Sequence, residues 1–257
     1  MTLAASIKIQ KNEAVAKAAL LNFLYRKDVR PKTIISELAL NKWKFRADIV
    51  VVGKGVFSAF EIKTENDRLT RLPSQLNAYS LIFQQVYAVL ASKHLAKAST
   101  MMDAHVGILE LVEEKSKSRI VEIRPPRTLR RADLSSMLQL FPVTELRRLL
   151  RRKGYDVNGL NRVEMERLVG FPTAILRDEL ISFLENRYGP TTARFRRKLK
   201  GRLVKPEDIR ELARLPRPVL SGASPSFDPF FEYLKGKEAY FGDVPLDVIA
   251  QLRLKSL

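Results

Sequence analysis

The sequence has 257 residues, a formal net charge of +18, no cysteine and two histidines. The lack of cysteine excludes disulfides and thiolate metal sites. No apolar run reaches about 18 residues and no secretory signal is visible, which predicts a cytoplasmic protein without a membrane partner. The positive charge favours a polyanion, most often nucleic acid, while a basic protein without such a partner is the alternative.

The first 125 residues alternate between helical and β periodicity. Residues 12–26 have helical spacing with Asn12 as the cap, and residues 33–40 (TIISELAL) predict a second short helix. The runs 46–52 and 56–63 predict a β-hairpin. Four further stretches follow: a polar turn at 64–72, a helix from Pro73 to about Gln85, a strand at 86–92 and a helix at 94–102. A closing hairpin at 105–112 and 118–124 completes an α/β domain, a mixed sheet flanked by helices.

Pro125-Pro126 predicts a domain boundary, because helical periodicity replaces β periodicity beyond it. The prediction is a domain at 1–125, an all-α domain at 126–213, and a linker with an aromatic tail at 214–257. Glycines stand where helix C-caps belong, at Gly154, Gly170 and Gly189.

The predicted first hairpin brings charged residues together. A two-residue turn at Lys54-Gly55 pairs Gly53 with Val56 and therefore places Asp48 opposite Glu61, and likewise Arg46 opposite Lys63, with all four side chains on one face. Two carboxylates about 5 Å apart repel by about 3 kcal/mol at an effective dielectric constant near 20. A divalent cation between them would remove that cost. A three-residue loop would instead turn Glu61 to the other face.

The order Asp48, then Glu61-Ile62-Lys63, then Gln75 and Tyr79 (QLNAY) resembles the PD-(D/E)XK nuclease superfamily in its RecB-like and phage-exonuclease-like branch. Residues 33–94 are also similar to a bacterial and phage family of largely uncharacterised predicted nucleases. Ala47 stands in place of the motif's proline, a position that the superfamily keeps loosely. The resemblance implies a restriction-endonuclease-like sheet.

By this resemblance, Asp48 and Glu61 would ligate Mg²⁺ or Mn²⁺, with the Ile62 carbonyl as a further ligand. Lys63 would orient the attacking water and stabilise the charged phosphate. Glu37, on the predicted early helix, matches the family's helix-borne acid and would be another metal ligand. The alternatives are solvent-facing strand ends for Asp48 and Glu61, and a surface acid for Glu37.

Two further groups flank the predicted site. Gln75 and Tyr79 are four residues apart and share one helix face, from which they would contact DNA or order the site. Arg68 and Arg71 precede that helix and would grip a phosphate near its N-terminus. Arg46 is placed to do the same, or to screen the two acids.

The helical half loosely resembles a SAP-like helix–extended–helix module over residues 144–171. Basic residues on its first helix would contact phosphates without base specificity. They are Arg147, Arg148, Arg151, Arg152 and Lys153. Residues 191–205 add a second basic cluster. Solvated helix faces are the alternative for both.

The leading hypothesis is a Mg²⁺- or Mn²⁺-dependent deoxyribonuclease with a basic helical DNA-binding domain, in a phage or mobile element. A non-catalytic DNA-binding or regulatory protein on a nuclease-like fold is the first rival. An RNA-directed nuclease is the second. The sequence does not predict the oligomeric state.

Overall fold

The computed structural model describes residues 3–27, 31–40, 44–53, 56–114 and 117–213. Its contacts divide the chain into Met1–Arg217 and Pro218–Leu257. The predicted linker and tail at 214–257 and the turn at Lys54-Gly55 lie outside the described residues. No described helix is long and apolar enough to cross a membrane.

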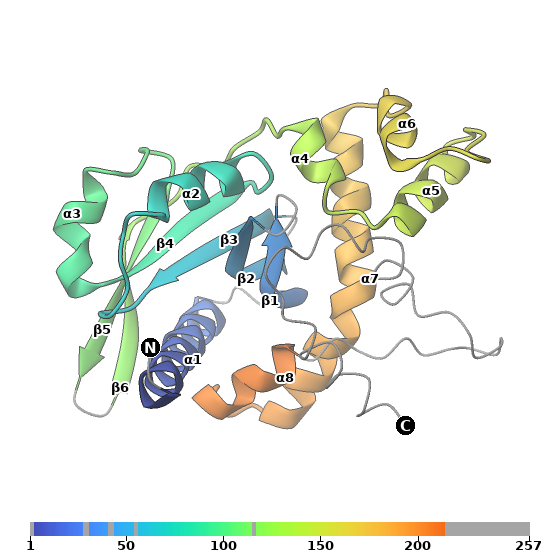
Figure 1. Cartoon of the computed structure of the whole chain (residues 1–257). Helices are drawn as coiled ribbons and strands as arrows, with labels where there is room; N and C mark the ends of the chain where they lie inside the picture. Colours follow the sequence, from blue (N-terminus) through green and yellow to red (C-terminus); the bar gives the residue numbers. More distant parts are fainter. Residues whose placement is uncertain (1–2, 28–30, 41–43, 54–55, 115–116, 214–257) are drawn as a thin grey trace. The chain divides into compact units, whose positions relative to one another are not determined.

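The described chain is a mixed α/β structure with a six-stranded sheet, flanking helices and a C-terminal helical region, as predicted (Figure 1). The strands are β1 (Thr33–Leu40), β2 (Phe45–Gly53), β3 (Val56–Lys63), β4 (Gln85–Ala91), β5 (Gly107–Glu114) and β6 (Lys117–Arg124). The α-helices are α1 (Leu3–Arg26), α2 (Leu72–Ser80), α3 (Leu95–Ser99), α4 (Leu134–Leu138), α5 (Val143–Arg152), α6 (Arg162–Arg167), α7 (Thr173–Leu199) and α8 (Arg210–Ala213). Two 3₁₀ turns are η1 (Ser92–His94) and η2 (Pro206–Ile209).

The strands lie in the sheet in chain order. Strands β1, β2 and β3 are antiparallel neighbours, β3, β4 and β5 are parallel neighbours, and β5 and β6 close the sheet as an antiparallel pair. Parallel neighbours need a crossover, which α2 supplies between β3 and β4 and η1–α3 between β4 and β5.

Two apolar clusters fill the two sides of the sheet. Helix α1 contributes Leu20 and Leu21 to the cluster that holds Ile49 and Phe60, while α2 contributes Leu76 to the opposite cluster. The opposite cluster also holds Val50 and Phe57 of the same two strands. Alternate residues of β2 and β3 therefore pack on opposite faces, as expected for a sheet covered on both sides.

The prediction of a helix at TIISELAL is wrong, because this stretch forms strand β1. Ile34 packs on the α1 side of the sheet and Ile35 on the α2 side. A strand buried on both faces has a nearly continuous apolar run, which a helical pattern can imitate. Glu37 therefore lies on a strand.

Helix boundaries also differ from the prediction. Helix α1 begins at Leu3, so Asn12 lies inside it and is not its cap. Helix α2 ends at Ser80, well before Gln85, and has its proline in the first turn as predicted.

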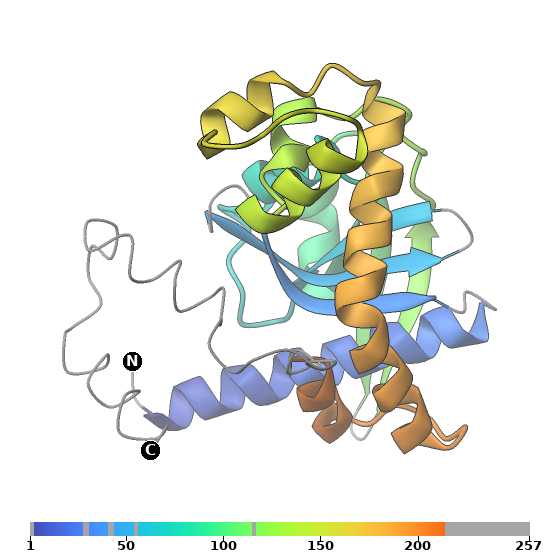
Figure 2. The same cartoon turned by 90° about the vertical axis from the view of Figure 1, so that its right-hand side faces the viewer.

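Helix α7 continues through Gly189 and Pro190, so the predicted C-cap at Gly189 is wrong. The next turn is held by tertiary contacts: Thr192 is buried, and its hydroxyl oxygen accepts the N–H of Ile34 at 2.9 Å. Figure 2 shows α7 passing alongside the edge strand β1. This anchoring favours continuation of the helix over the stop that Gly-Pro alone would predict.

The helical region has the predicted helix–extended–helix order at α5 and α6. Leu146 of α5 and Leu180 of α7 belong to the same apolar cluster as Phe57 and Tyr79 of the sheet region. The two regions thus share one core within Met1–Arg217. The boundary at 125/126 stays a prediction.

Candidate functional site

The first hairpin has the predicted register where the structure describes it. The pairing of β2 with β3 runs from Gly53–Val56 to Ile49–Phe60. Beyond the Ile49–Phe60 pair, a side chain joins the two strands, because Oδ2 of Asp48 accepts the N–H of Ile62 at 2.7 Å. The carboxylate of Asp48 thus takes the place that a backbone carbonyl occupies in a ladder.

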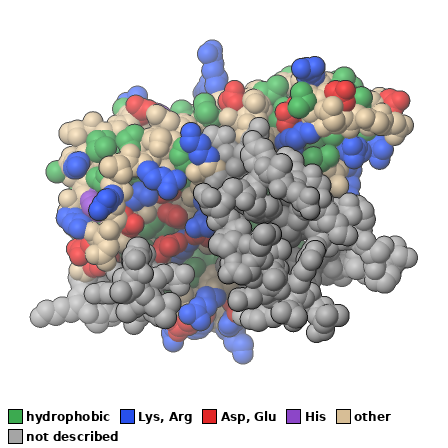
Figure 3. All heavy atoms as spheres, viewed as in Figure 1, with side chains coloured by type: hydrophobic (Ala, Val, Ile, Leu, Met, Phe, Trp, Pro, Cys, Tyr) green, Lys and Arg blue, Asp and Glu red, His purple; other side chains and the backbone are tan. Residues whose placement is uncertain are grey.

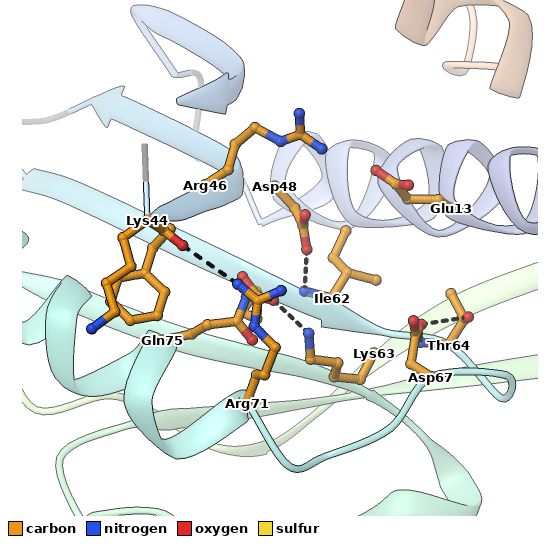
Figure 4. Close-up of a pocket in the computed structure, with 12 residues that line it drawn as sticks. Glu13, Lys44, Arg46, Asp48, Ile62, Lys63, Thr64, Asp67, Arg71 and Gln75 are labelled. Carbon is orange, nitrogen blue, oxygen red and sulfur yellow. Dashed lines mark hydrogen bonds and ion pairs between the residues drawn. The ribbon is translucent and has the colours of Figure 1, made fainter. Parts of the chain in front are cut away.

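A cavity of about 350 Å³ opens at this point (Figure 4). It brings together the predicted residues Asp48, Glu61, Ile62 and Lys63 from two adjacent strands. Its other lining residues are Glu13, Lys44, Phe45, Arg46, Thr64, Asp67, Arg71 and Gln75. Figure 3 shows acidic side chains gathered in a hollow, with lysines and arginines around it. An acidic floor with a basic rim suits a cation below and a polyanion above.

Glu61 is the most enclosed acid of the cavity, with 2% of its surface exposed. Its Oε1 accepts from Lys63 Nζ at 2.6 Å and from Gln75 Nε2 at 2.5 Å. Its Oε2 accepts from the Tyr79 hydroxyl at 2.6 Å. Gln75 and Tyr79 share one face of α2, as predicted, and both hold this carboxylate.

Tyr79 and Gln75 are both buried, and their polar atoms have different partners. Burial and the charge of Glu61 raise the pKa of Tyr79, so its hydroxyl stays protonated and donates. Gln75 is also buried, and its Oε1 has no hydrogen-bond partner among the described residues. Because the amide nitrogen donates to Glu61, the amide oxygen is left as a buried acceptor without a donor among the described residues.

Asp48 lies close enough to the Glu61 carboxylate to interact with its charge. Burial, followed by the nearby charge of Glu61, raises the pKa of Asp48 well above its usual range. This agrees with the predicted carboxylate repulsion. A hard divalent ion would relieve it, and the donors here, two carboxylates in one cavity with a buried free amide oxygen beside them, fit Mg²⁺ or Mn²⁺.

A second acidic group lies on the α1 side of Asp48. Oxygens of Glu13, Glu37 and Asp48 lie within 4.8 Å of one another. Glu37 reaches this group from β1, where its backbone adopts a left-handed conformation with φ of 63°. Such a conformation is rare outside glycine and is often found at functional sites. Glu37 also forms an ion pair with Arg46.

The helix-borne acid of the site is Glu13 on α1, which the sequence reasoning missed. Lys17, one turn further on, is buried and pairs with it at 2.6 Å. The signal in the sequence is a charged pair at i and i+4 directly before the apolar run from Ala18 to Leu21. A lysine on the buried face of a helix indicates partners across the interface.

The predicted phosphate-binding residues differ in position. Arg46 and Arg71 line the cavity and are exposed, and Lys44 joins them on the rim. Arg71 occupies the N-cap position of α2 without a side-chain capping hydrogen bond, and it donates to the Lys44 carbonyl at 3.4 Å. Arg68 is exposed and does not line the cavity.

The arginines of α5 all have partners inside the helical region. Arg147 donates to the Leu160 carbonyl, Arg148 to Glu145, Arg151 to Asn158 and Arg152 to Glu179. Arg148, Arg151 and Arg152 remain exposed. These contacts order the module and leave the outer faces of the three guanidinium groups available to an anion.

The fold and the cavity define a mixed α/β protein with a carboxylate-lined, basic-rimmed pocket. The family model of bacteriophage P4 protein cII matches residues 7–213, and the chain belongs to this family. It is similar to Protein cII of Enterobacteria phage P4, with 32% identity over 192 residues that cover 74% of this chain and 72% of the relative. A protein of unknown function from Silicibacter pomeroyi aligns over 49% of this chain and 84% of its own, with 18% identity and a TM-score of 0.30, too low to inform the fold.

Proposed function

We propose that the chain is a Mg²⁺- or Mn²⁺-dependent deoxyribonuclease whose active site is the cavity at the end of the first hairpin. The observation that carries the proposal is the convergence of Asp48, Glu61 and Lys63 in one pocket. Two carboxylates from adjacent strands in one pocket, next to a lysine, are typical of a site that binds a cation. The resemblance to PD-(D/E)XK nucleases supports the same assignment.

In this proposal each side chain has a definite task. Asp48 and Glu61 would hold the ion, which when bound would supply positive charge for the scissile phosphate and lower the pKa of a water. Lys63, 12% exposed, donates one N–H to Glu61 and keeps two for a water or a phosphate oxygen. Gln75 holds the Glu61 carboxylate through its amide nitrogen.

The basic rim would bind the polymer. Lys44, Arg46 and Arg71 stand around the acidic floor and would contact phosphates on either side of the scissile bond. The exposed guanidinium groups of α5 would extend non-specific contact along the nucleic acid. The phage relative is consistent with a role in a phage or mobile element.

A second candidate is a non-catalytic DNA-binding or regulatory protein on a nuclease-like fold. The observation in its favour is that both oxygens of Glu61 are already satisfied by protein donors. A pocket that is complete without an ion would serve structure alone. The raised pKa of Asp48, which burial and Glu61 cause, favours the nuclease.

The deciding experiment is a cleavage assay with plasmid, linear duplex, single-stranded DNA and RNA, each with Mg²⁺, Mn²⁺ or EDTA. Asp48→Ala and Lys63→Ala should abolish cleavage. The matched control is Glu113→Gln, which alters an exposed glutamate of β5 that does not line the cavity and should cleave normally. Cleavage that persists in both alanine variants would refute the site, cleavage of RNA alone would favour an RNA-directed nuclease, and salt-sensitive DNA binding without cleavage would favour the second candidate.

A further inference from the structure

Lys17 is the one lysine in the described chain that ranks among its buried residues, with 3% of its surface exposed. It projects from α1 among Ala16, Leu20 and Leu21, which belong to the apolar cluster on that side of the sheet. An ammonium group in such surroundings is stable only if its charge and its N–H donors are satisfied. Its partners therefore indicate what the residue is for.

All three N–H donors of Lys17 have an acceptor. Nζ contacts Glu13 Oε1 at 2.6 Å and Glu37 Oε1 in a shorter ion pair, and the Ser36 hydroxyl lies at 3.5 Å. The acceptors come from the preceding turn of α1 and from β1. Lys17 is thus coordinated on several sides by oxygens, as a bound cation would be.

The acids that Lys17 contacts are those next to the proposed ion site. Glu13 and Glu37 form one group with Asp48, all three offering oxygens within 4.8 Å of one another. Figure 4 shows Glu13 on α1 and Asp48 on β2 facing the same cavity. A spacing of that kind could accommodate a second divalent ion, as in nucleases with two ions about 4 Å apart. The Lys17 ammonium lies against two of the three acids instead.

Of the three acids, Asp48 is the one without an ion pair among the described residues. Glu13 and Glu37 are paired with Lys17, and Glu37 also with Arg46. Among the described residues no ion pair involves Asp48, whose oxygen accepts only from the Ile62 N–H. Asp48 therefore has no cation in direct contact among the described residues, although the charge of Lys17 acts on it, and its nearest acid outside the group is Glu61.

We propose that Lys17 is a resident cation of the pocket: its ammonium occupies the place of a second divalent ion, so that the pocket binds one ion, at Asp48 and Glu61. This inference rests on the proposed function, because it presumes that a divalent ion binds at all. It assigns Lys17 as a positioning residue that sets the number of ions and holds Glu13 and Glu37 away from the first one.

The test is the number of Mn²⁺ ions bound per chain, counted by electron paramagnetic resonance of free Mn²⁺ during titration of the full-length protein. Wild type should bind one ion. Lys17→Met, which keeps the length of the side chain and removes its charge, should bind two, and a frozen sample should show the spectrum of a coupled Mn²⁺ pair. Lys27→Met, which breaks the exposed Lys27–Glu122 pair of 2.6 Å, is the matched control and should bind one ion.

The outcomes separate the inference from the proposed function. One ion in both wild type and folded Lys17→Met would overturn the role of Lys17 and leave the nuclease proposal intact, and two ions in wild type would do the same. No ion in wild type would remove the proposed metal site and this inference with it. If circular dichroism shows that Lys17→Met does not fold, Lys17→Gln takes its place. If neither variant folds, the number of Mn²⁺ ions bound by wild type decides, and two ions would overturn the inference.

Discussion

The half-buried Asp48 and the buried Asp208 lie in contrasting electrostatic surroundings. Asp208, on η2, is 2% exposed and receives Arg202 Nη1 at 2.7 Å, Arg202 Nη2 at 2.8 Å and the Lys205 N–H at 2.9 Å. Asp48 receives one N–H and lies near a second carboxylate. The hydrogen bond from Arg202 lowers the pKa of Asp208, whereas burial and Glu61 raise that of Asp48.

The difference indicates what each acid does for the protein. A buried carboxylate that gains a bidentate arginine stabilises the fold. One that is left beside another acid costs stability and is retained for another reason. The comparison predicts that the same substitution, aspartate to asparagine, has opposite consequences at the two positions.

The largest expected effect is on metal affinity. Asp48→Asn should weaken Mn²⁺ binding by about 100-fold or more, since even loss of an outer-shell partner typically weakens a site 10- to 100-fold. Asp208→Asn should leave the affinity unchanged. Isothermal titration calorimetry measures both, and equal losses in the two variants would contradict the distinction.

The next effect is on stability, in the reverse order. Asp208→Asn should lower the melting temperature by about 5 °C, because a charge-assisted bidentate contact is lost. Asp48→Asn, measured without divalent ions, should melt at or above the wild-type temperature, since a repulsion is removed. A drop at Asp48 as large as that at Asp208 would show that Asp48 is a structural acid.

A pH series sharpens the stability difference. The pKa of Asp208 is lower in the folded chain than in the unfolded one, so its contribution is present above the unfolded pKa of about 3.9 and is lost as pH falls through the folded value. The melting temperatures of wild type and Asp208→Asn should therefore differ at pH 6 and converge below about pH 4. A gap that widens on acidification would contradict the assignment.

The smallest effect concerns the support of Glu61. Tyr79→Phe removes the hydroxyl that contacts Glu61 Oε2 at 2.6 Å and the Arg46 carbonyl at 3.0 Å, and should lower stability by about 1 kcal/mol. Metal affinity should fall by less than tenfold. Tyr87→Phe is the control, because Tyr87 stacks on Phe60 of the other sheet face. A larger affinity loss at Tyr87 would refute the supporting role of Tyr79.

The hairpin and its register were predictable because β2 and β3 are local and alternate regularly. The pairing of Gly53 with Val56 follows from the turn, and the positions of Asp48 and Glu61 in one pocket follow from the pairing. The parts that depend on distant contacts were not predictable. Ile34 and Ile35 are both buried because packed layers cover both faces of β1. The spacing of apolar residues in the sequence does not indicate this double coverage.

The residues that α1 contributes to the pocket could not be predicted from the sequence. Glu13 and Lys17 enter the site because α1 packs against the sheet, where it contacts β3 and β6 and where Lys17 reaches Glu37 of β1. Only tertiary packing determines which face of α1 points there. The sequence predicts Glu37 as an acid of the site but places it on a helix. In the structure it lies on a strand, and its left-handed backbone lets it reach the same acids from there. The motif therefore predicted the hairpin half of the site and not the half that α1 supplies.

The most direct test of the central claim is the nicking of supercoiled plasmid at saturating Mg²⁺ by wild type, Asp48→Asn and Asp208→Asn, at a temperature where all three are folded. The pocket assignment predicts metal-dependent cleavage by wild type and Asp208→Asn, and a rate lower by about 1,000-fold for Asp48→Asn. Equal cleavage by Asp48→Asn, or cleavage by wild type that EDTA does not stop, would contradict it.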